Sequence, residues 1–382
     1  MEDLGDQPAL YIGGTLVEPL DGPQPLRRWD GETWMNLGPF NGPVHALEAA
    51  GGVLYVGGAF TTVDFTLGNG TPMNGFVVNH VARIRSLDPP IWEALGIGTD
   101  GIVHALSWGL YSSSPFDRLG VGGAFTMAGG LPASGFAYWD LNAPNGGWTA
   151  VDPLLPPGGG GTPVVYTIAS YALDDYLRPF NVGGLFRVPD AASPTGFSDN
   201  VARLLGINDD WYGSSVPGAG VTSASEHAVR SIAPAVDQSG EAIFVGGEFE
   251  SFNDVTSPQI VRISGDTHSL GSCLNGAVEA MISFDDGNGE ALYVGGLFTN
   301  SDLEHFVARW RAPPGDLEGD GIVTPTDFTV EDESSRGLLW CLAGPEPWHN
   351  VAGLCGCSDL NRDGVVDLRD LAGLMNLLGT TN

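Results

Sequence analysis

Two segments near the C-terminus place oxygen-bearing side chains at the spacing of a twelve-residue calcium loop, over residues 316–327 and 359–370. In such a loop, oxygens at positions 1, 3 and 5 converge on the ion and glycine at position 6 makes the turn. The carbonyl at position 7 is a ligand, and a carboxylate at position 12 closes the coordination sphere. The predicted ligands are Asp316, Glu318, Asp320, the carbonyl of Ile322 and Asp327 in the first loop, and Asp359, Asn361, Asp363, the carbonyl of Val365, Asp367 and Asp370 in the second.

The alternative interpretation of each loop is a solvated acidic turn. Four carboxylates gather in each loop and repel one another unless a cation lies between them. Two full-length matches in tandem favour metal binding, so the sequence predicts two bound Ca²⁺ ions.

A helix is indicated after the second loop, where Leu371, Leu374, Met375 and Leu378 recur on one face. Paired loops with Asp at position 12 and an exiting helix resemble dockerin type I modules. The loop starts lie 43 residues apart, and the receptor-facing positions 10 and 11 hold Pro325-Thr326 and Leu368-Arg369. The resemblance implies a small α-helical calcium-binding module over residues 313–382. It also implies docking to a cohesin-like or other surface protein receptor, typically by secreted polysaccharide-degrading proteins.

Three of the four cysteines lie within a short C-terminal stretch, which suits a local disulfide in an oxidising compartment. The dockerin resemblance implies that Cys341 pairs with Cys355 or with Cys357 and that Cys273 stays free. Both pairings remain open.

The rest of the chain is organised by a repeat. An aromatic or apolar residue, Val, Gly-Gly, any residue and Phe recur with minor variation, and the first glycine of each pair is Gly13, Gly57, Gly122, Gly183, Gly246 or Gly295. The spacing of 44 to 65 residues between these glycines is that of a four-stranded propeller blade.

Each Gly-Gly phrase has neighbours in a fixed order. A short apolar strand such as 44–47 precedes it, a strand such as 81–84 follows, and a further strand is opened by Trp34, Trp92, Trp148 or Trp211. The first repeat lacks its first strand and the sixth lacks a clear fourth. We expect an all-β, six-bladed β-propeller of antiparallel blades over residues 9–312, closed by pairing these ends; seven blades, with one lost at the N-terminus, is the alternative. The phrases resemble kelch-like and galactose-oxidase-central-domain-like propellers of secreted bacterial proteins.

The glycine pairs and tryptophans have two interpretations each. A phosphate-binding loop would need a following helix, so we expect the glycines to mark bulges or close approaches between blades, with the next Phe filling the space. We expect the tryptophans to form inter-blade core in preference to a sugar-stacking platform. Asp30-Gly31 predicts a two-residue type I′ hairpin turn.

The bulk charge limits the partners. There are 15 basic residues, all Arg, against 46 acidic ones, for a formal charge of −31. This charge repels phosphate backbones and anionic lipids, so nucleic acid and membrane insertion are not expected. No apolar run is long enough to span a bilayer. No signal peptide is evident, which we interpret as a missing natural start of a secreted or cell-surface protein; an intracellular protein is the alternative.

One repeat position varies in chemistry: the second residue of the first strand, which is His45, His104, Tyr166, Arg230 or Glu279. If that strand is innermost, these side chains line the propeller channel and bind a ligand or ion there; otherwise they are hydrogen-bonded wall residues. No catalytic motif is recognised, although paired glycosidase carboxylates have no fixed spacing. The favoured hypothesis is a non-enzymatic extracellular scaffold or binding protein, with polysaccharide as a further partner. The alternative is a secreted carbohydrate-active enzyme.

Overall fold

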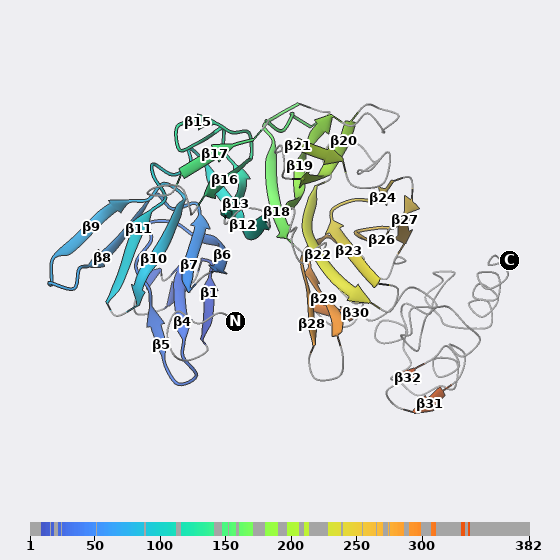
Figure 1. Cartoon of the computed structure of the whole chain (residues 1–382). Helices are drawn as coiled ribbons and strands as arrows, with labels where there is room; N and C mark the ends of the chain where they lie inside the picture. The colour runs from blue at the N-terminus through green and yellow to red at the C-terminus, as the bar shows by residue number, and fades with distance from the viewer. Residues whose placement is uncertain are drawn as a thin grey trace. The chain divides into compact units, whose positions relative to one another are not determined.

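A computed structural model of the chain shows a series of antiparallel sheets (Figure 1). The chain divides into two compact units, Met1–Gly220 and Val221–Asn382. The structure describes residues 9–15, 17–18, 22–23, 25–50, 52–87, 89–111, 116–140, 147–151, 153–157, 160–170, 180–189, 197–205, 210–213, 228–237, 240–253, 255–264, 266–269, 274, 276–285, 290–298, 307–310, 330–332 and 335–336.

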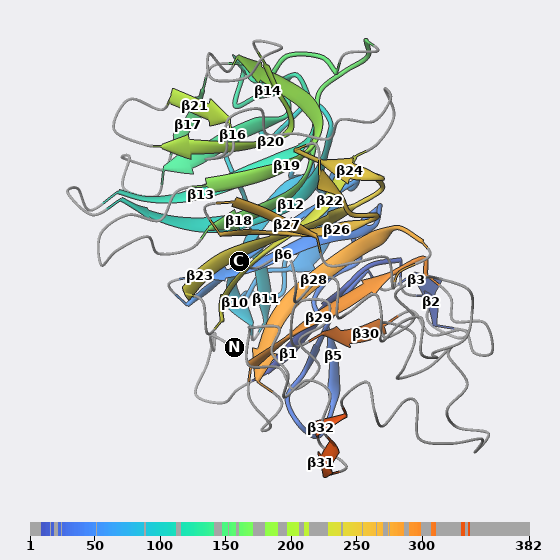
Figure 2. The same ribbon diagram turned by 90° about the vertical axis from the view of Figure 1, so that its right-hand side faces the viewer.

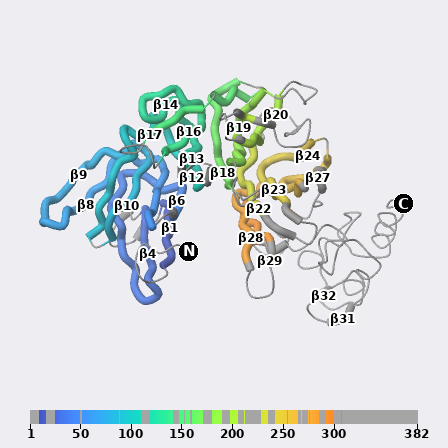
Figure 3. The backbone as a smooth tube through the Cα atoms, in the orientation of Figure 1, coloured from blue at the N-terminus to red at the C-terminus, as the bar shows by residue number. Residues whose placement is uncertain are grey.

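The first unit contains four main sheets. Sheet 1 is β1 (Leu10–Gly13), β4 (Leu26–Trp29) and β5 (Trp34–Asn36), and sheet 2 is β6 (Val44–Ala50), β7 (Val53–Gly58), β10 (Val81–Leu87) and β11 (Pro90–Ala94). Sheet 3 is β12 (Ile102–Tyr111), β13 (Phe116–Ala124), β16 (Phe136–Asp140) and β17 (Gly147–Ala150), and sheet 4 is β18 (Val164–Ser170), β19 (Phe180–Pro189), β20 (Phe197–Leu205) and β21 (Asp210–Gly213). The tube in Figure 3 follows this course from blue to green.

The second unit contains two main sheets. Sheet 5 is β22 (Val229–Asp237), β23 (Gly240–Gly247), β26 (Ile260–Ser264) and β27 (Asp266–Ser269), and sheet 6 is β28 (Val278–Asp285), β29 (Glu290–Gly296) and β30 (Val307–Trp310). The three strands of sheet 6 lie side by side in both ribbon views (Figures 1 and 2).

Small two-stranded ribbons complete the described strands. They are β2 (Val17–Glu18) with β3 (Gly22–Pro23), β8 (Thr62–Thr66) with β9 (Pro72–Val77), β14 (Met127–Ala128) with β15 (Leu131–Pro132), β24 (Ser251–Phe252) with β25 (Val255–Thr256), and β31 (Val330–Asp332) with β32 (Ser335–Arg336). Four of these ribbons, all but β31 with β32, lie between the second and third strands of their repeats.

The predicted strand order is confirmed. Sheets 2 to 6 are antiparallel meanders in which the Gly-Gly strand lies second, as β7 does between β6 and β10, and in sheet 1 the Gly-Gly strand is the edge strand β1. Among the described residues, sheet 1 lacks the first strand of the pattern and sheet 6 lacks the fourth, as the sequence indicated.

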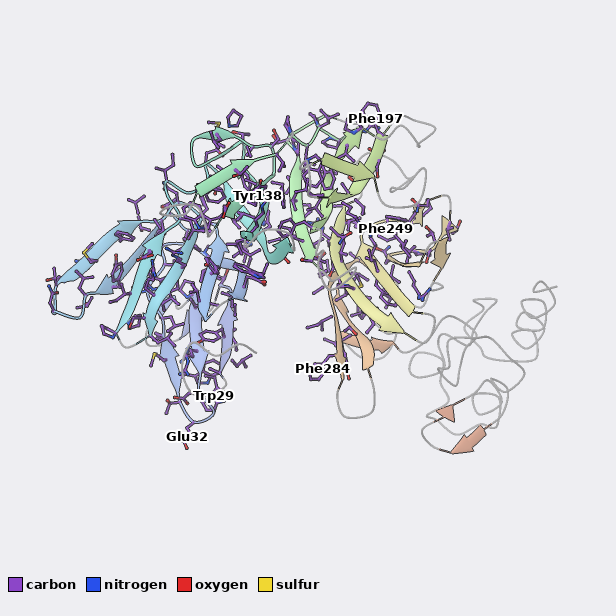
Figure 4. All side chains as sticks on the ribbon, viewed as in Figure 1. Trp29, Glu32, Tyr138, Phe197, Phe249 and Phe284 are labelled. Atoms are coloured by element: carbon purple, nitrogen blue, oxygen red, sulfur yellow. The ribbon has the colours of Figure 1, made fainter. Side chains whose placement is uncertain are left out.

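The predicted two-residue turn at Asp30-Gly31 is wrong. Trp29 pairs with Trp34, so the loop between them has four residues, and Gly31 has a positive φ whereas Asp30 does not. The Asp30 carboxylate accepts hydrogen bonds from the backbone N–H groups of Thr33 and Glu32 at 2.7 and 2.9 Å, which lower its pKa to about 2. This side chain closes the loop in place of a type I′ backbone. Trp29 and Glu32 mark the turn in Figure 4.

The apolar core lies between consecutive sheets of a unit. In β7, Leu54 and Val56 pack toward sheet 1, whereas Tyr55 packs toward sheet 3. Because side chains alternate across a strand, a strand covered on both faces reads as a continuous apolar run. Similar clusters join sheet 3 to sheet 4 and sheet 5 to sheet 6. The repeated phrase is therefore the sequence of a strand buried on both faces.

The two glycines of each pair serve different purposes. A Cβ atom added to Gly57 would lie 2.5 Å from Cγ1 of Val103 in the next sheet, and Gly13, Gly122 and Gly246 face the corresponding valine in the same way. The first glycine thus permits close approach between sheets, as predicted. The phenylalanines that follow the pairs are buried: Phe60, Phe125, Phe186, Phe249 and Phe298.

Three of the four predicted core tryptophans pack between sheets and one does not. Trp92 is buried in the core between sheets 1 and 2, and Trp148 packs against the core between sheets 2 and 3. Trp211 meets Phe136 of the preceding sheet edge to face. Trp34 is 42% exposed, because no described sheet precedes sheet 1 within its unit. The core assignment is therefore wrong for Trp34.

The described residues make an all-β structure with no helix. No closed barrel or propeller is found among them, and no described helix is long and apolar enough to cross a membrane. Apart from the short β31–β32 ribbon, the expected module at 313–382 lies outside the described residues, and the boundary at 312 stays a prediction.

Candidate functional site: a row of bulge residues

The residue position that varies in chemistry is a β-bulge in each of five sheets. Val44 pairs with Gly58 and Ala46 pairs with Gly57, so His45 between them has no partner in the ladder. The same skip occurs at His104, Tyr166, Arg230 and Glu279. A bulge inserts one unpaired residue and redirects its side chain. The chemical variation of its side chains marked this position in the sequence. The structure shows that the position is a bulge.

The second glycine of each pair makes room for the bulge. A Cβ atom on Gly58 would collide with the backbone carbonyl oxygen of Pro43, which precedes the bulged strand. Gly123, Gly184, Gly247 and Gly296 face the corresponding carbonyl in their own sheets. A side chain there would push the first strand away, so the second glycine and the bulge depend on each other.

Three bulge side chains of the first unit form a continuous row. The ring centres of His45 and His104 lie 5.4 Å apart at 76°, and those of His104 and Tyr166 lie 5.4 Å apart at 47°. These residues come from β6, β12 and β18, the edge strands of three consecutive sheets. The structure therefore brings together three residues that are about 60 positions apart in the chain.

The row is partly open to solvent. His45 is exposed, and His104 and Tyr166 are half-buried. Desolvation by its surroundings lowers the pKa of His45, which favours the neutral imidazole. The rings of the row are tilted to one another, whereas a flat stacking platform would need them parallel.

The bulges of the second unit carry charge. Arg230 on β22 lies 3.9 Å from the carboxylate of Glu248, measured between Nη2 and Oε2. Glu279 on β28 is exposed. In the second unit the bulge position therefore carries a cation, Arg230, and an anion, Glu279.

The loops before the bulged strands of sheets 2 and 3 are each fixed by a residue that sequence inspection missed. Asp100 accepts hydrogen bonds from the N–H groups of Thr126 and Met127, both at 2.8 Å, and from the Thr126 hydroxyl at 2.6 Å. Asn41 makes the equivalent contacts with Thr61 and Thr62. In both repeats an Asn or Asp precedes a Gly, and a Thr follows the repeated Phe. This combination of residues was the signal that the sequence offered for the contact.

The remaining predicted site residues lie outside the described part of the chain. These are both calcium loops, 316–327 and 359–370, and the four cysteines. Within the described residues, no group of three or more His, Cys, Asp or Glu side chains is placed to hold a metal ion. The calcium and disulfide predictions stay predictions.

Comparison with known proteins gives no family. No family model and no curated protein matches the sequence. Among solved structures, the chain is similar to the computationally designed Ika8 protein, with 12% identity and a TM-score of 0.30, over 75% of this chain and 77% of the designed one. A likeness at that score carries no conclusion, so function is inferred from the residues themselves.

Proposed function

We propose that this chain is an extracellular scaffold or binding protein. Its repeated sheets form a propeller used for recognition, and its C-terminal loops form a calcium-dependent, dockerin-like module that attaches it to a receptor. The observation that carries the proposal is the pair of twelve-residue loops at 316–327 and 359–370. Their carboxylate, amide and carbonyl oxygens are the hard ligands that Ca²⁺ prefers.

The recognition role is supported by the contrast between scaffold and bulge. Valine, the glycine pair and the buried phenylalanine recur in the second to sixth repeats, whereas the bulge carries imidazole, phenol, guanidinium or carboxylate. A fixed backbone with interchangeable side chains is how repeat proteins build binding surfaces. Such a surface suits a polar ligand, and polysaccharide is the class proposed here.

The propeller arrangement is supported by the way consecutive sheets pack within each unit. The first glycine of one sheet receives a valine of the next, between sheets 1 and 2 and again between sheets 5 and 6. The terminal sheets leave apolar side chains exposed: Leu10, Trp34 and Met35 on sheet 1, and Ile282, Phe284 and Val307 on sheet 6. Phe284 is labelled on β28 in Figure 4. A ring closed by these sheets covers such side chains, which stacked repeats otherwise leave open.

The attachment role is tested with the full chain and an immobilised type I cohesin. Binding is measured by biolayer interferometry in millimolar Ca²⁺ and again in EGTA. We expect binding in calcium that is lost in EGTA and restored when calcium returns. An absence of binding in calcium, or binding that EGTA does not change, would contradict calcium-dependent attachment to a cohesin-like receptor.

The recognition role has a separate test. The full chain is incubated with insoluble cellulose and xylan, and the bound fraction is compared with that of a variant carrying Tyr166→Ala and Arg230→Ala. We expect lower retention of the variant at unchanged thermal stability. Equal retention of both proteins would exclude the bulge positions from polysaccharide binding.

A further inference from the structure

The rings of His45 and His104 lie close enough to bind one ion together. Two imidazoles that share a tetrahedral zinc ion, at Zn–N distances of about 2.0–2.1 Å, hold their ring centres about 5 Å apart in different planes. The observed separation is 5.4 Å with an interplanar angle of 76°. Edge-to-face rings in contact without an ion fall in the same range, about 4.5–7 Å, so the observed distance allows a shared ion without requiring one.

The backbone fixes this pair more firmly than two surface histidines would be fixed. Each histidine is the inserted residue of a bulge, and each bulge is held by a glycine whose side-chain position is blocked by backbone. The two strands belong to consecutive sheets joined by the Gly57–Val103 contact next to the bulges. Little conformational entropy is therefore lost when an ion joins the rings, and prior organisation of ligands favours binding.

The protonation state also suits coordination. A metal takes the neutral imidazole, which predominates above the ordinary histidine pKa of about 6.5. Coordination uses one nitrogen of each ring and leaves the other for a hydrogen bond, which commonly orients metal-bound histidines. Imidazole ligands suit zinc, copper and nickel, whereas calcium prefers oxygen.

We propose that His45 and His104 together bind one divalent transition-metal ion of the zinc or copper class, with water completing the coordination and Tyr166 as the neighbouring ring. The site lies in the first unit and uses none of the residues of the predicted calcium loops. It is independent of the attachment role proposed above and adds a second, chemically distinct metal to the protein.

The test is electron paramagnetic resonance of the full chain with one equivalent of Cu²⁺, in excess Ca²⁺ so that carboxylate sites are occupied. We expect hyperfine coupling to two imidazole nitrogens in the wild-type protein and to one in His45→Gln and in His104→Gln. Calorimetric titration with Zn²⁺ should show one site. Loss of either imidazole should weaken it by more than the roughly 10–100-fold that follows loss of an outer-shell partner.

Two further variants control the assignment. His349→Gln removes a histidine outside the pair, and Tyr166→Phe removes the neighbouring hydroxyl; both should keep the two-nitrogen spectrum. If His104→Gln does not fold, as judged by circular dichroism, His45→Gln at the exposed end carries the test. Wild-type protein without two-nitrogen coupling, or a His45→Gln variant with an unchanged spectrum and Zn²⁺ affinity, would overturn the proposal.

Discussion

The indole Nε1 of Trp92 donates a hydrogen bond of 2.7 Å to the backbone carbonyl oxygen of Leu37 in the preceding sheet. One repeat later, Nε1 of Trp148 donates to the carbonyl of Leu95 over the same distance. Leu37 and Leu95 each lie three residues after the tryptophan of their own repeat. The repeat is therefore joined by a directional polar bond as well as by apolar packing, and this bond sets the register of one sheet against the next.

We predict that Trp92→Phe destabilises the first unit by about 1–3 kcal/mol. Phenylalanine keeps most of the apolar ring but leaves the buried Leu37 carbonyl without its donor, and an unsatisfied buried acceptor has a cost of this size. Urea unfolding followed by circular dichroism measures the change.

The matched control is Trp139→Phe, because the Trp139 indole is also buried but its Nε1 has no hydrogen-bond partner among the described residues. This change shortens the ring without removing a hydrogen bond, so it should cost less than Trp92→Phe. Equal losses at both positions would show that ring size, and not the hydrogen bond, determines the effect.

We predict that the two glycines of one pair respond differently to alanine. Gly57→Ala meets a side chain, Cγ1 of Val103, and should cost about 1–3 kcal/mol through overpacking. Adding Val103→Ala should recover part of that loss. Gly58→Ala meets the Pro43 carbonyl, which is backbone, so trimming Val103 should recover nothing there. A double-mutant cycle by urea unfolding separates the two cases.

Gly68→Ala is the control for this series. A Cβ atom at Gly68 has no neighbour within 4 Å, and its φ is not positive. Its stability should change by less than about 0.5 kcal/mol. If Val103→Ala rescues Gly58→Ala as well as it rescues Gly57→Ala, the separate purposes assigned to the two glycines are wrong.

Much of the fold could be predicted from the sequence because its repeats are local. Short apolar strands, glycine pairs and a fixed strand order are properties of a single repeat, and each was predicted from the sequence. The turn at Asp30 was missed because its geometry depends on a side-chain carboxylate accepting backbone hydrogen bonds, which an Asp-Gly pair does not reveal. Trp34 was missed because burial depends on what precedes sheet 1, which no repeat encodes.

The sequence marked the position of the candidate site but did not reveal that the position is a bulge. Chemical variation at His45, His104 and Tyr166 marked the position, whereas the bulge appears only when strand register is known. The ring distances depend on the offset between neighbouring sheets, and the sequence of a single strand does not encode this offset. Asn41 and Asp100 were overlooked because their partners lie 20 or more residues away.

We predict that the Asp100 contact weakens in acid. Desolvation raises the pKa of this carboxyl, but hydrogen bonds from Thr126 and Met127 outweigh it and the net pKa is lowered. A group whose pKa is lower when folded stabilises the protein above its unfolded pKa of about 3.9, and that contribution is lost as pH falls through the folded value. Asp100→Asn, which mimics Asn41, should lack this dependence. Comparing the urea midpoints of wild type and variant at pH 7 and pH 3 isolates the effect; a constant difference would contradict it.

We predict that charge at Ile282 destabilises the protein although the side chain is 61% exposed on β28 of sheet 6. Its equivalent in sheet 5, Ala233, is buried in the core that sheet 5 forms with sheet 6. In the proposed ring another sheet covers Ile282 in the same way, and an unpaired lysine there loses its hydration. Ile282→Lys should therefore cost about 2 kcal/mol or more, whereas Ile97→Lys, at 65% exposure on a turn, should stay within about 0.5 kcal/mol. Thermal unfolding of both variants decides, and equal small effects would contradict ring closure.

We predict last that the full chain binds two Ca²⁺ ions and that each loop can be disabled separately. Residues 315–382 hold 12 acidic side chains and three arginines, so without cations the carboxylates of both loops repel one another. Asp320→Ala and Asp363→Ala each remove the ligand at position 5 of one loop and should each abolish one calcium site in a calorimetric titration. Calcium at 100 times its Kd stabilises whatever folds around it by about 2.7 kcal/mol, so one calorimetric transition should move to higher temperature in calcium while the others stay in place.

Asp285→Ala, in the acidic hairpin of sheet 6, is the control and should keep both sites. Two sites that persist in Asp320→Ala and Asp363→Ala, or unfolding that EGTA leaves unchanged, would remove calcium from the proposed function and the dockerin-like attachment with it.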